Sequence, residues 1–239
     1  MFEMRKSEER GVGKLDWLDA RFTFQFGPYK NPDQIGFSDL RLLNDDMVKA
    51  GGGFATHEHK DTEVFSYVLE GALEHKDSMG YGSVVKPNEV LTMSAGSGIT
   101  HSEYNHSKEQ NVHFLQIWMV SGKKGVEPRY AQKVFPDAEK RGRLRLIISE
   151  DGRDGSLPFY QDTSIYAGLF NDGEKADLTL APNRYAYVHV IRGRVKLNGT
   201  QLNDGDGVKV RNEERLAFSN GENAELLVFD MRPLEKPQI

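Results

Sequence analysis

Two pairs of residues in this chain have the types and the spacing of metal ligands. The first pair is His57 and His59, and the second is His101 and Glu103, each separated by one residue. Side chains at positions i and i+2 of a β-strand point to the same face. A barrel that brings both strands together would therefore surround one point with three imidazoles and a carboxylate. This donor set suits Fe(II), Mn(II), Ni(II), Co(II) or Zn(II), and it leaves coordination positions open for water, dioxygen or substrate.

The other candidate ligands fit this arrangement less well. Glu63 shares the face of His57 and His59, but it lies well beyond His59 in the sequence. The separation is roughly 13 Å along an extended strand, so only a turn at residues 60–61 would bring Glu63 back to the site. We expect no metal-binding role for the remaining histidines, which are His75 (placed at the surface or behind the ligands), His106, His113 and His189.

The elements that must position these residues are short strands. The chain contains 24 glycines, and short apolar runs such as residues 63–69 and 112–119 lie between turn signals. Pairs such as Asn198-Gly199 and Asn220-Gly221 favour tight turns because both residue types accept positive φ. No long amphipathic helix is evident, and residues 136–141 are the most helix-like stretch. The pattern predicts an all-β protein, a sandwich or barrel.

The chain also contains an internal repeat. Residues 67–73 (YVLEGAL) resemble residues 189–195 (HVIRGRV), each reading as a strand, a charged residue, a glycine turn and a returning strand. A repeat of this kind predicts two β-barrel modules in tandem. We expect an N-terminal domain over residues 1–130, a charged linker over residues 131–150 and a C-terminal domain over residues 151–239.

Composition excludes several function classes. The formal net charge is −5, from 31 Lys and Arg against 36 Asp and Glu, which argues against direct binding of nucleic acid. The absence of cysteine excludes disulfides, thiolate metal sites and cysteine nucleophiles. We see neither the apolar region of a signal peptide nor an apolar run long enough for a transmembrane helix, so we expect a cytoplasmic protein with no membrane partner.

Three longer motifs resemble the pirin family of the cupin superfamily. They are residues 53–59 (GFATHEH), 67–78 (YVLEGALEHKDS) and 93–103 (MSAGSGITHSE). The start of the chain is similar to the bacterial pirin-like proteins described as quercetin 2,3-dioxygenases. The resemblance covers essentially the whole chain and is strongest over residues 10–130.

The resemblance implies a bicupin with a metal in the N-terminal barrel alone. Carried over to this sequence, the metal ligands are His57, His59, His101 and Glu103, and Glu63 is not a ligand. The implied cofactor is one divalent transition metal, with Fe(II) as first choice and Mn, Co, Ni, Cu or Zn as alternatives. The second module lacks the ligand pairs, so it is expected to be structural.

The resemblance also implies an activity. It suggests that dioxygen cleaves a flavonol such as quercetin with release of carbon monoxide, and that Glu103 serves as both ligand and base. Phe54, Phe65 and Tyr67 are our candidates for contact with the planar substrate. Two alternatives stay open: a regulatory protein that acts through a protein partner, with a structural or redox-sensing metal, and a metal-dependent isomerase or dioxygenase on another substrate.

Overall fold

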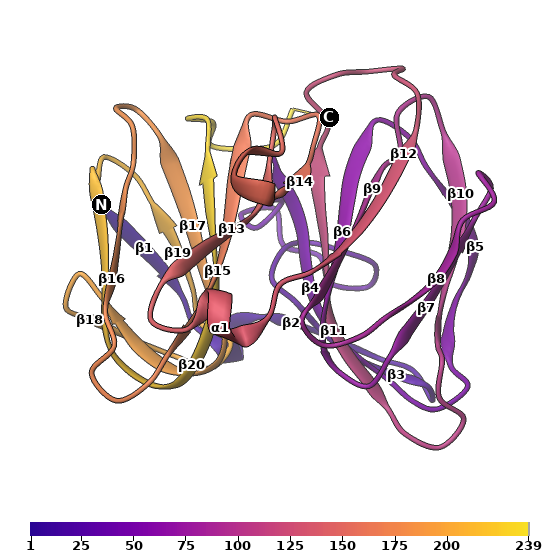
Figure 1. The fold of residues 1–239 in the computed structure, drawn as a ribbon, viewed down its shortest axis with the longest axis horizontal. Helices are drawn as coiled ribbons and strands as arrows, with labels where there is room; N and C mark the ends of the chain where they lie inside the picture. Colours follow the sequence, from indigo (N-terminus) through magenta and orange to yellow (C-terminus); the bar gives the residue numbers. More distant parts are fainter. Residues whose placement is uncertain (239) are drawn as a thin grey trace. The chain divides into compact units, whose positions relative to one another are not determined.

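The computed structural model describes residues 1–238, and their regular secondary structure is almost entirely β-strand (Figure 1). This confirms the expected all-β class. The short helix α1 (Asp137–Lys140) falls in the stretch that the sequence marked as most helix-like. Within the described residues, no helix has the length and apolarity needed to cross a membrane.

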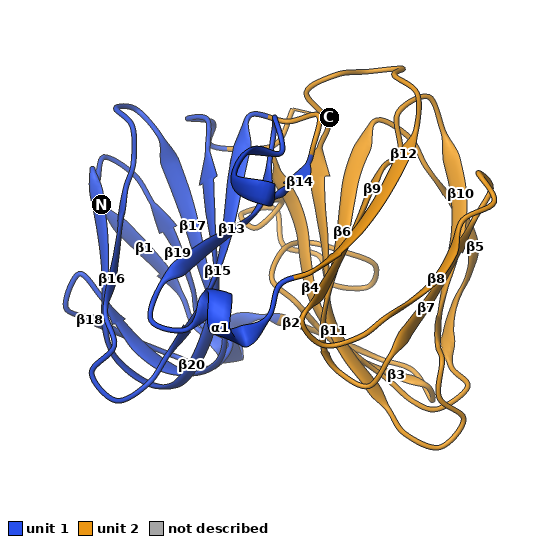
Figure 2. Cartoon of the chain, in the orientation of Figure 1, with its two compact units in different colours: residues 1–10, 135–158, 162–235 blue, residues 11–134, 159–161, 236–239 orange. Residues whose placement is uncertain are grey.

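The chain divides into two compact units (Figure 2). Unit 1 contains residues 1–10, 135–158 and 162–235, and unit 2 contains residues 11–134, 159–161 and 236–239.

Unit 2 is built from two antiparallel sheets. The seven-stranded sheet has the order β12-β9-β6-β11-β4-β3-β2, and the four-stranded sheet has the order β5-β10-β7-β8. The strands are β2 (Gly11–Lys14), β3 (Leu18–Phe22), β4 (Leu40–Val48), β5 (Gly53–His59), β6 (Thr62–Glu70), β7 (Leu73–Asp77), β8 (Gly82–Val85), β9 (Glu89–Ser94), β10 (Ile99–Asn105), β11 (Val112–Val120) and β12 (Arg129–Val134).

The core of unit 2 lies between these two sheets. Val64 and Phe114 of the large sheet pack in one apolar cluster with Leu73, Val85 and Ile99 of the small sheet. Each of these side chains is almost fully buried. Burial of this apolar surface drives the sheets together, and it leaves the alternate, polar positions to face the solvent or line internal sites.

Unit 1 is built around one nine-stranded sheet. Its main path is β1-β19-β17-β20-β15-β13-β14, while β16 pairs with β20 and β18 pairs with β17. The strands are β1 (Phe2–Arg5), β13 (Leu144–Ser149), β14 (Leu157–Pro158), β15 (Thr163–Phe170), β16 (Ala176–Thr179), β17 (Tyr185–Leu197), β18 (Thr200–Asn203), β19 (Gly207–Val210) and β20 (Arg215–Met231).

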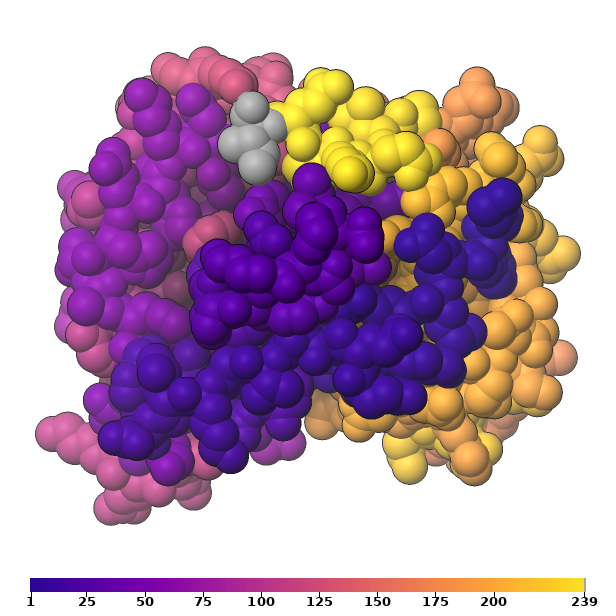
Figure 3. Space-filling model, turned by 180° about the vertical axis from the view of Figure 1, so that it is seen from behind, coloured from indigo at the N-terminus to yellow at the C-terminus, as the bar shows by residue number. Residues whose placement is uncertain are grey.

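The first residues of the chain complete the sheet of unit 1. Strand β1 pairs with β19 in the register Phe2 opposite Val210. In the space-filling view of Figure 3, indigo atoms near the N-terminus lie against yellow and orange atoms of the C-terminal part of the chain. Residues 135–158, which include part of the predicted linker, also belong to unit 1. The domain boundaries at residues 130 and 150 stay a prediction.

The two Asn-Gly pairs of the sequence adopt different structures. Asn198 and Gly199 both have positive φ and connect β17 to β18, as expected for an Asn-Gly hairpin. Asn220-Gly221 does not end a strand, because β20 continues through it while the pairing with β17 changes register nearby. A long, bent strand therefore replaces the predicted turn at that point.

Gly71, between β6 and β7, offers a test of the turn geometry. Its φ is +74°, and a Cβ there would lie 2.5 Å from the carbonyl oxygen of Asn111, whereas Gly80 has φ +87° with open space around it. Both alanine variants adopt an unfavourable left-handed conformation, but only Gly71→Ala also forces the backbone apart. We expect Gly71→Ala to lower the free energy of unfolding by about 1–3 kcal/mol more than Gly80→Ala in urea titrations. Equal losses would contradict this account.

Candidate metal centre

The two histidine segments meet because β5 and β10 are neighbouring antiparallel strands. Their register places His101 opposite His57 and Ile99 opposite His59. The register then shifts between His101 and Glu103, and such an irregularity re-aims the side chains that follow it. One pair of strands therefore carries all four residues singled out in the sequence.

The side chains form two overlapping groups of potential metal ligands that share His101. One ring nitrogen from each of His57, His59 and His101 lies within 4.8 Å of the others, and the second group contains His75, His101 and Glu103. His57 Nε2 is 3.0 Å from His101 Nε2. The Glu103 Oε2 atom is 4.0 Å from His101 Nε2. His57 is half-buried and the other residues of these groups are buried, so the cluster has one side open toward solvent.

The electrostatics of the cluster suit a bound cation. Burial lowers the pKa of His101 to about 2, and the imidazoles around it add to the effect. Burial, followed by the nearby His57, lowers the pKa of His59 to about 4. Both rings are therefore neutral near pH 7, and the buried Nε2 atom of His59 has no hydrogen-bond partner. Neutral imidazoles with free lone pairs beside a carboxylate fit a divalent transition metal.

The large sheet orients the Glu103 carboxylate. Ser66 Oγ lies 3.1 Å from Oε1, and Gln116 Nε2 donates to Oε2 at 2.6 Å. Burial raises the pKa of Glu103 to about 7, although these two hydrogen bonds oppose the shift. Ser66 and Gln116 are opposite each other on β6 and β11, and each interrupts an apolar run. A serine and a glutamine inside apolar strands are a sequence signal for buried polar residues, and the motifs considered above did not include them.

His75 supports His101 from the side away from His57. His75 is 0% exposed, so the alternative that placed it at the surface is wrong. Its Nε2 atom is 3.0 Å from Asp77 Oδ2, and its Nδ1 atom is 3.4 Å from His101 Nδ1. A carboxylate only accepts, so His75 Nε2 donates, its Nδ1 accepts, and His101 Nδ1 carries the proton. His101 Nε2 is then unprotonated, and its lone pair faces His57.

The other candidate residues lie outside these clusters. Glu63 accepts hydrogen bonds from Ser94 and Ser121 and belongs to neither donor group found in the described residues. His106 contacts Glu74 at the surface, and His113 bonds to Asp45. His189 is buried in β17 of unit 1.

A pocket of about 430 Å³ lies beside the centre. Its wall includes His57 and Glu103 together with Trp17, Phe26 and Trp118. Phe54 also lines it, whereas Phe65 and Tyr67 are core residues that do not. Sequence reasoning missed the other aromatic residues because they come from strands and loops that only the fold brings together.

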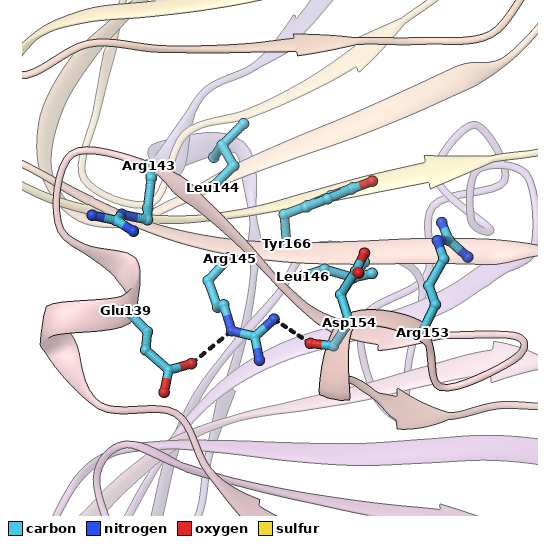
Figure 4. Close-up of a pocket in the computed structure, with 8 residues that line it drawn as sticks. All are labelled: Glu139, Arg143, Leu144, Arg145, Leu146, Arg153, Asp154 and Tyr166. Carbon is cyan, nitrogen blue, oxygen red and sulfur yellow. Dashed lines mark hydrogen bonds and ion pairs between the residues drawn. The ribbon is translucent and has the colours of Figure 1, made fainter.

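Unit 1 has a pocket of a different kind, of about 410 Å³ (Figure 4). Its charged groups are largely paired, since Arg145 Nε donates to Glu139 at 2.7 Å and Arg145 Nη1 donates to the Asp154 carbonyl at 2.8 Å. Both groups of potential metal ligands among residues 1–238 belong to unit 2. The described residues of unit 1 therefore form a β-sheet but contain neither of these groups of potential metal ligands.

Comparisons with known proteins agree with this architecture. Residues 3–119 match the family model described as Pirin, and residues 146–231 match that described as the quercetinase C-terminal cupin domain. The chain belongs to the pirin family, and its two tandem cupin domains confirm the bicupin prediction.

Individual relatives cover almost the whole chain. A protein of Escherichia coli K12 named quercetin 2,3-dioxygenase is 40% identical over 234 residues, which are 98% of this chain and 100% of that protein. A putative quercetin 2,3-dioxygenase of Pasteurella multocida is 36% identical, covering 97% of this chain and 100% of the relative. The crystal structure of the E. coli bacterial pirin YhhW in complex with nickel(II) superposes with a TM-score of 0.93 at 40% identity, covering 98% and 100% of the two chains.

The His75 arrangement predicts an effect on metal affinity. His75→Phe removes the acceptor for His101 Nδ1 while keeping a ring in the site, and the loss of such supporting contacts weakens metal binding about 10- to 100-fold. Competition of the purified protein with a chromophoric chelator for Ni(II) measures this change. His113→Phe is the control, because it removes a histidine that also bonds an aspartate but lies outside the cluster. Equal affinities of the two variants would refute the supporting role of His75.

Proposed function

We propose that this chain is a metal-dependent dioxygenase that cleaves flavonols such as quercetin with O₂ and releases carbon monoxide. In this proposal His57, His59, His101 and Glu103 hold one divalent transition metal. The observation that carries it is the convergence of these donors at the wall of an aromatic-lined pocket. The names of the relatives and the nickel(II) complex of a similar protein support the same assignment.

The three imidazoles and the carboxylate leave coordination positions for a substrate oxygen or dioxygen. The chemistry that a bound divalent ion supplies there is Lewis acidity toward the 3-hydroxyl oxygen of the flavonol. Fe(II) is the metal that we propose first, with Ni(II), Mn(II), Co(II), Cu(II) or Zn(II) as alternatives to be ranked by reconstitution.

In this proposal, protein side chains accept the proton that the 3-hydroxyl group of the substrate releases. Glu103 is the group that takes the 3-hydroxyl proton. Gln116 donates to its Oε2 atom at 2.6 Å, and Ser66 Oγ lies 3.1 Å from its Oε1 atom and 2.8 Å from Gln116 Oε1, so both side chains hold the carboxyl group in place. The aromatic side chains of Trp17, Phe26 and Trp118 would bind the planar rings and exclude water.

A reconstitution experiment tests the proposal. Chelated protein is reloaded with each metal, and quercetin bleaching is followed together with oxygen uptake and carbon monoxide release. We expect turnover that depends on the metal, that is lost in His101→Ala, and that persists in His106→Ala, whose imidazole lies at the surface. Stoichiometric metal binding without turnover by any metal would overturn the flavonol assignment and favour the regulatory alternative.

A second variant tests the base. Glu103→Gln keeps the shape of the side chain but cannot accept the proton, and general-base catalysis contributes about 10²- to 10⁴-fold. We expect turnover to fall by that factor while the variant retains part of its metal. Glu58→Gln is the matched control, because Glu58 is an exposed glutamate on the neighbouring strand β5. Unchanged activity in Glu103→Gln would exclude Glu103 as the base.

A further inference from the structure

Two buried polar side chains of β4 line the pocket beside the metal centre. Asn44 and Asp46 are separated by one residue, so they share the inner face of the strand. They are only 4% and 2% exposed, and both line the 430 Å³ pocket. The Oδ1 atom of each is buried and has no hydrogen-bond partner.

Such atoms are costly to keep in a folded protein. Burial of a polar group without a hydrogen bond costs free energy, and each case in a native structure needs an explanation. Neither cross-strand neighbour of Asn44 supplies one. Phe22 is apolar, and the amide of Gln116 is committed to Glu103 and Ser66.

Besides His57, Glu103 and Gln116, the rest of the pocket lining is mostly aromatic, and one of its aromatic side chains has a polar atom without a partner. Trp118 Nε1 is a buried donor without a partner, and it lies in the same pocket as Asn44 and Asp46. A carboxyl, an amide and an indole N–H therefore interrupt a lining that also contains Trp17 and Phe54. A planar aromatic ligand that carries several hydroxyl groups matches this mixture of apolar surface and hydrogen-bonding atoms.

We infer that Asp46, assisted by Asn44, recognises hydroxyl groups of the aromatic ligand other than the one that faces His57 and Glu103. The ligand class rests on the proposed function, whereas the recognition itself does not require turnover. Burial, followed by the nearby Asp45 and Glu103, raises the pKa of Asp46 well above its ordinary value. The Asp46 carboxyl group accepts a hydrogen bond from a phenolic hydroxyl in either protonation state.

The experiment measures binding without catalysis. Nickel-loaded protein is titrated anaerobically with quercetin or with 3-hydroxyflavone, and dissociation constants are taken from calorimetry. 3-Hydroxyflavone keeps the 3-hydroxyl group of quercetin but lacks its other hydroxyl groups. Trp17 and Trp118 are the two tryptophans of the chain and both line the pocket, so quenching of their fluorescence shows where the ligand binds. Thermal melting of each variant is recorded in parallel.

Asp46→Leu replaces the two carboxyl oxygens with methyl groups and keeps the branching of the side chain. We expect quercetin to bind about 3- to 10-fold more weakly, as for the loss of one hydrogen bond, and the affinity for 3-hydroxyflavone to stay unchanged. Asp46→Asn should restore most of the quercetin affinity. Because Asp46→Leu removes an unsatisfied buried atom, the melting temperature of this variant should stay the same or rise.

Asp19→Leu is the control, since Asp19 is an aspartate of the neighbouring strand β3 whose side chain bonds Arg21 instead of lining the pocket. Equal weakening for both ligands, or a lower melting temperature with unchanged affinity, would overturn the inference, because Asp46 would then act on a shared feature or on the fold alone. Selective binding without turnover would leave this inference standing and count against the proposed function. If the protein turns over quercetin but Asp46→Leu weakens both ligands equally, the proposed function would stand and this inference would fail.

Discussion

The register between β5 and β10 is the constraint on which the candidate site depends. It sets His101 opposite His57, and the shift before Glu103 directs that carboxylate toward the opposite sheet. A slip of one residue would turn every side chain of a strand to the other face. The apolar core beneath the strands resists such a slip, because Ile99 is buried in the same cluster as residues of the large sheet.

Burial then gives these side chains their chemical character. It lowers the pKa values of His59 and His101 and raises that of Glu103. The two imidazoles are therefore neutral and can donate an electron pair to a metal ion. Hydrogen bonds on the outer side of the cluster hold the geometry: His101 donates to His75, and Gln116 donates to Glu103. The site thus has rigid polar support beneath it and an aromatic pocket above it.

The two units show how one type of sheet serves different purposes. Unit 2 keeps histidines, a glutamate and polar pocket residues on its inner faces, whereas the cluster at the centre of unit 1 is apolar, with Val188, Leu197, Phe218 and Val228 among its members. Filling the interior with apolar side chains stabilises a barrel but leaves no donors for a metal. The repeat in the sequence therefore identifies a shared architecture and not a shared function.

The sequence by itself determined the all-β class, the tandem repeat and the pairing of His57 with His59 and of His101 with Glu103. These features follow from alternation, turn residues and spacing, which are local properties of the chain. Only the tertiary structure decided which residues surround those pairs. His75, Gln116 and Asp46 reach the site from other strands, and β1 joins unit 1 through residues about 200 positions away. Strand pairing over such separations depends on the packing of the whole sheet, so no local pattern specifies it.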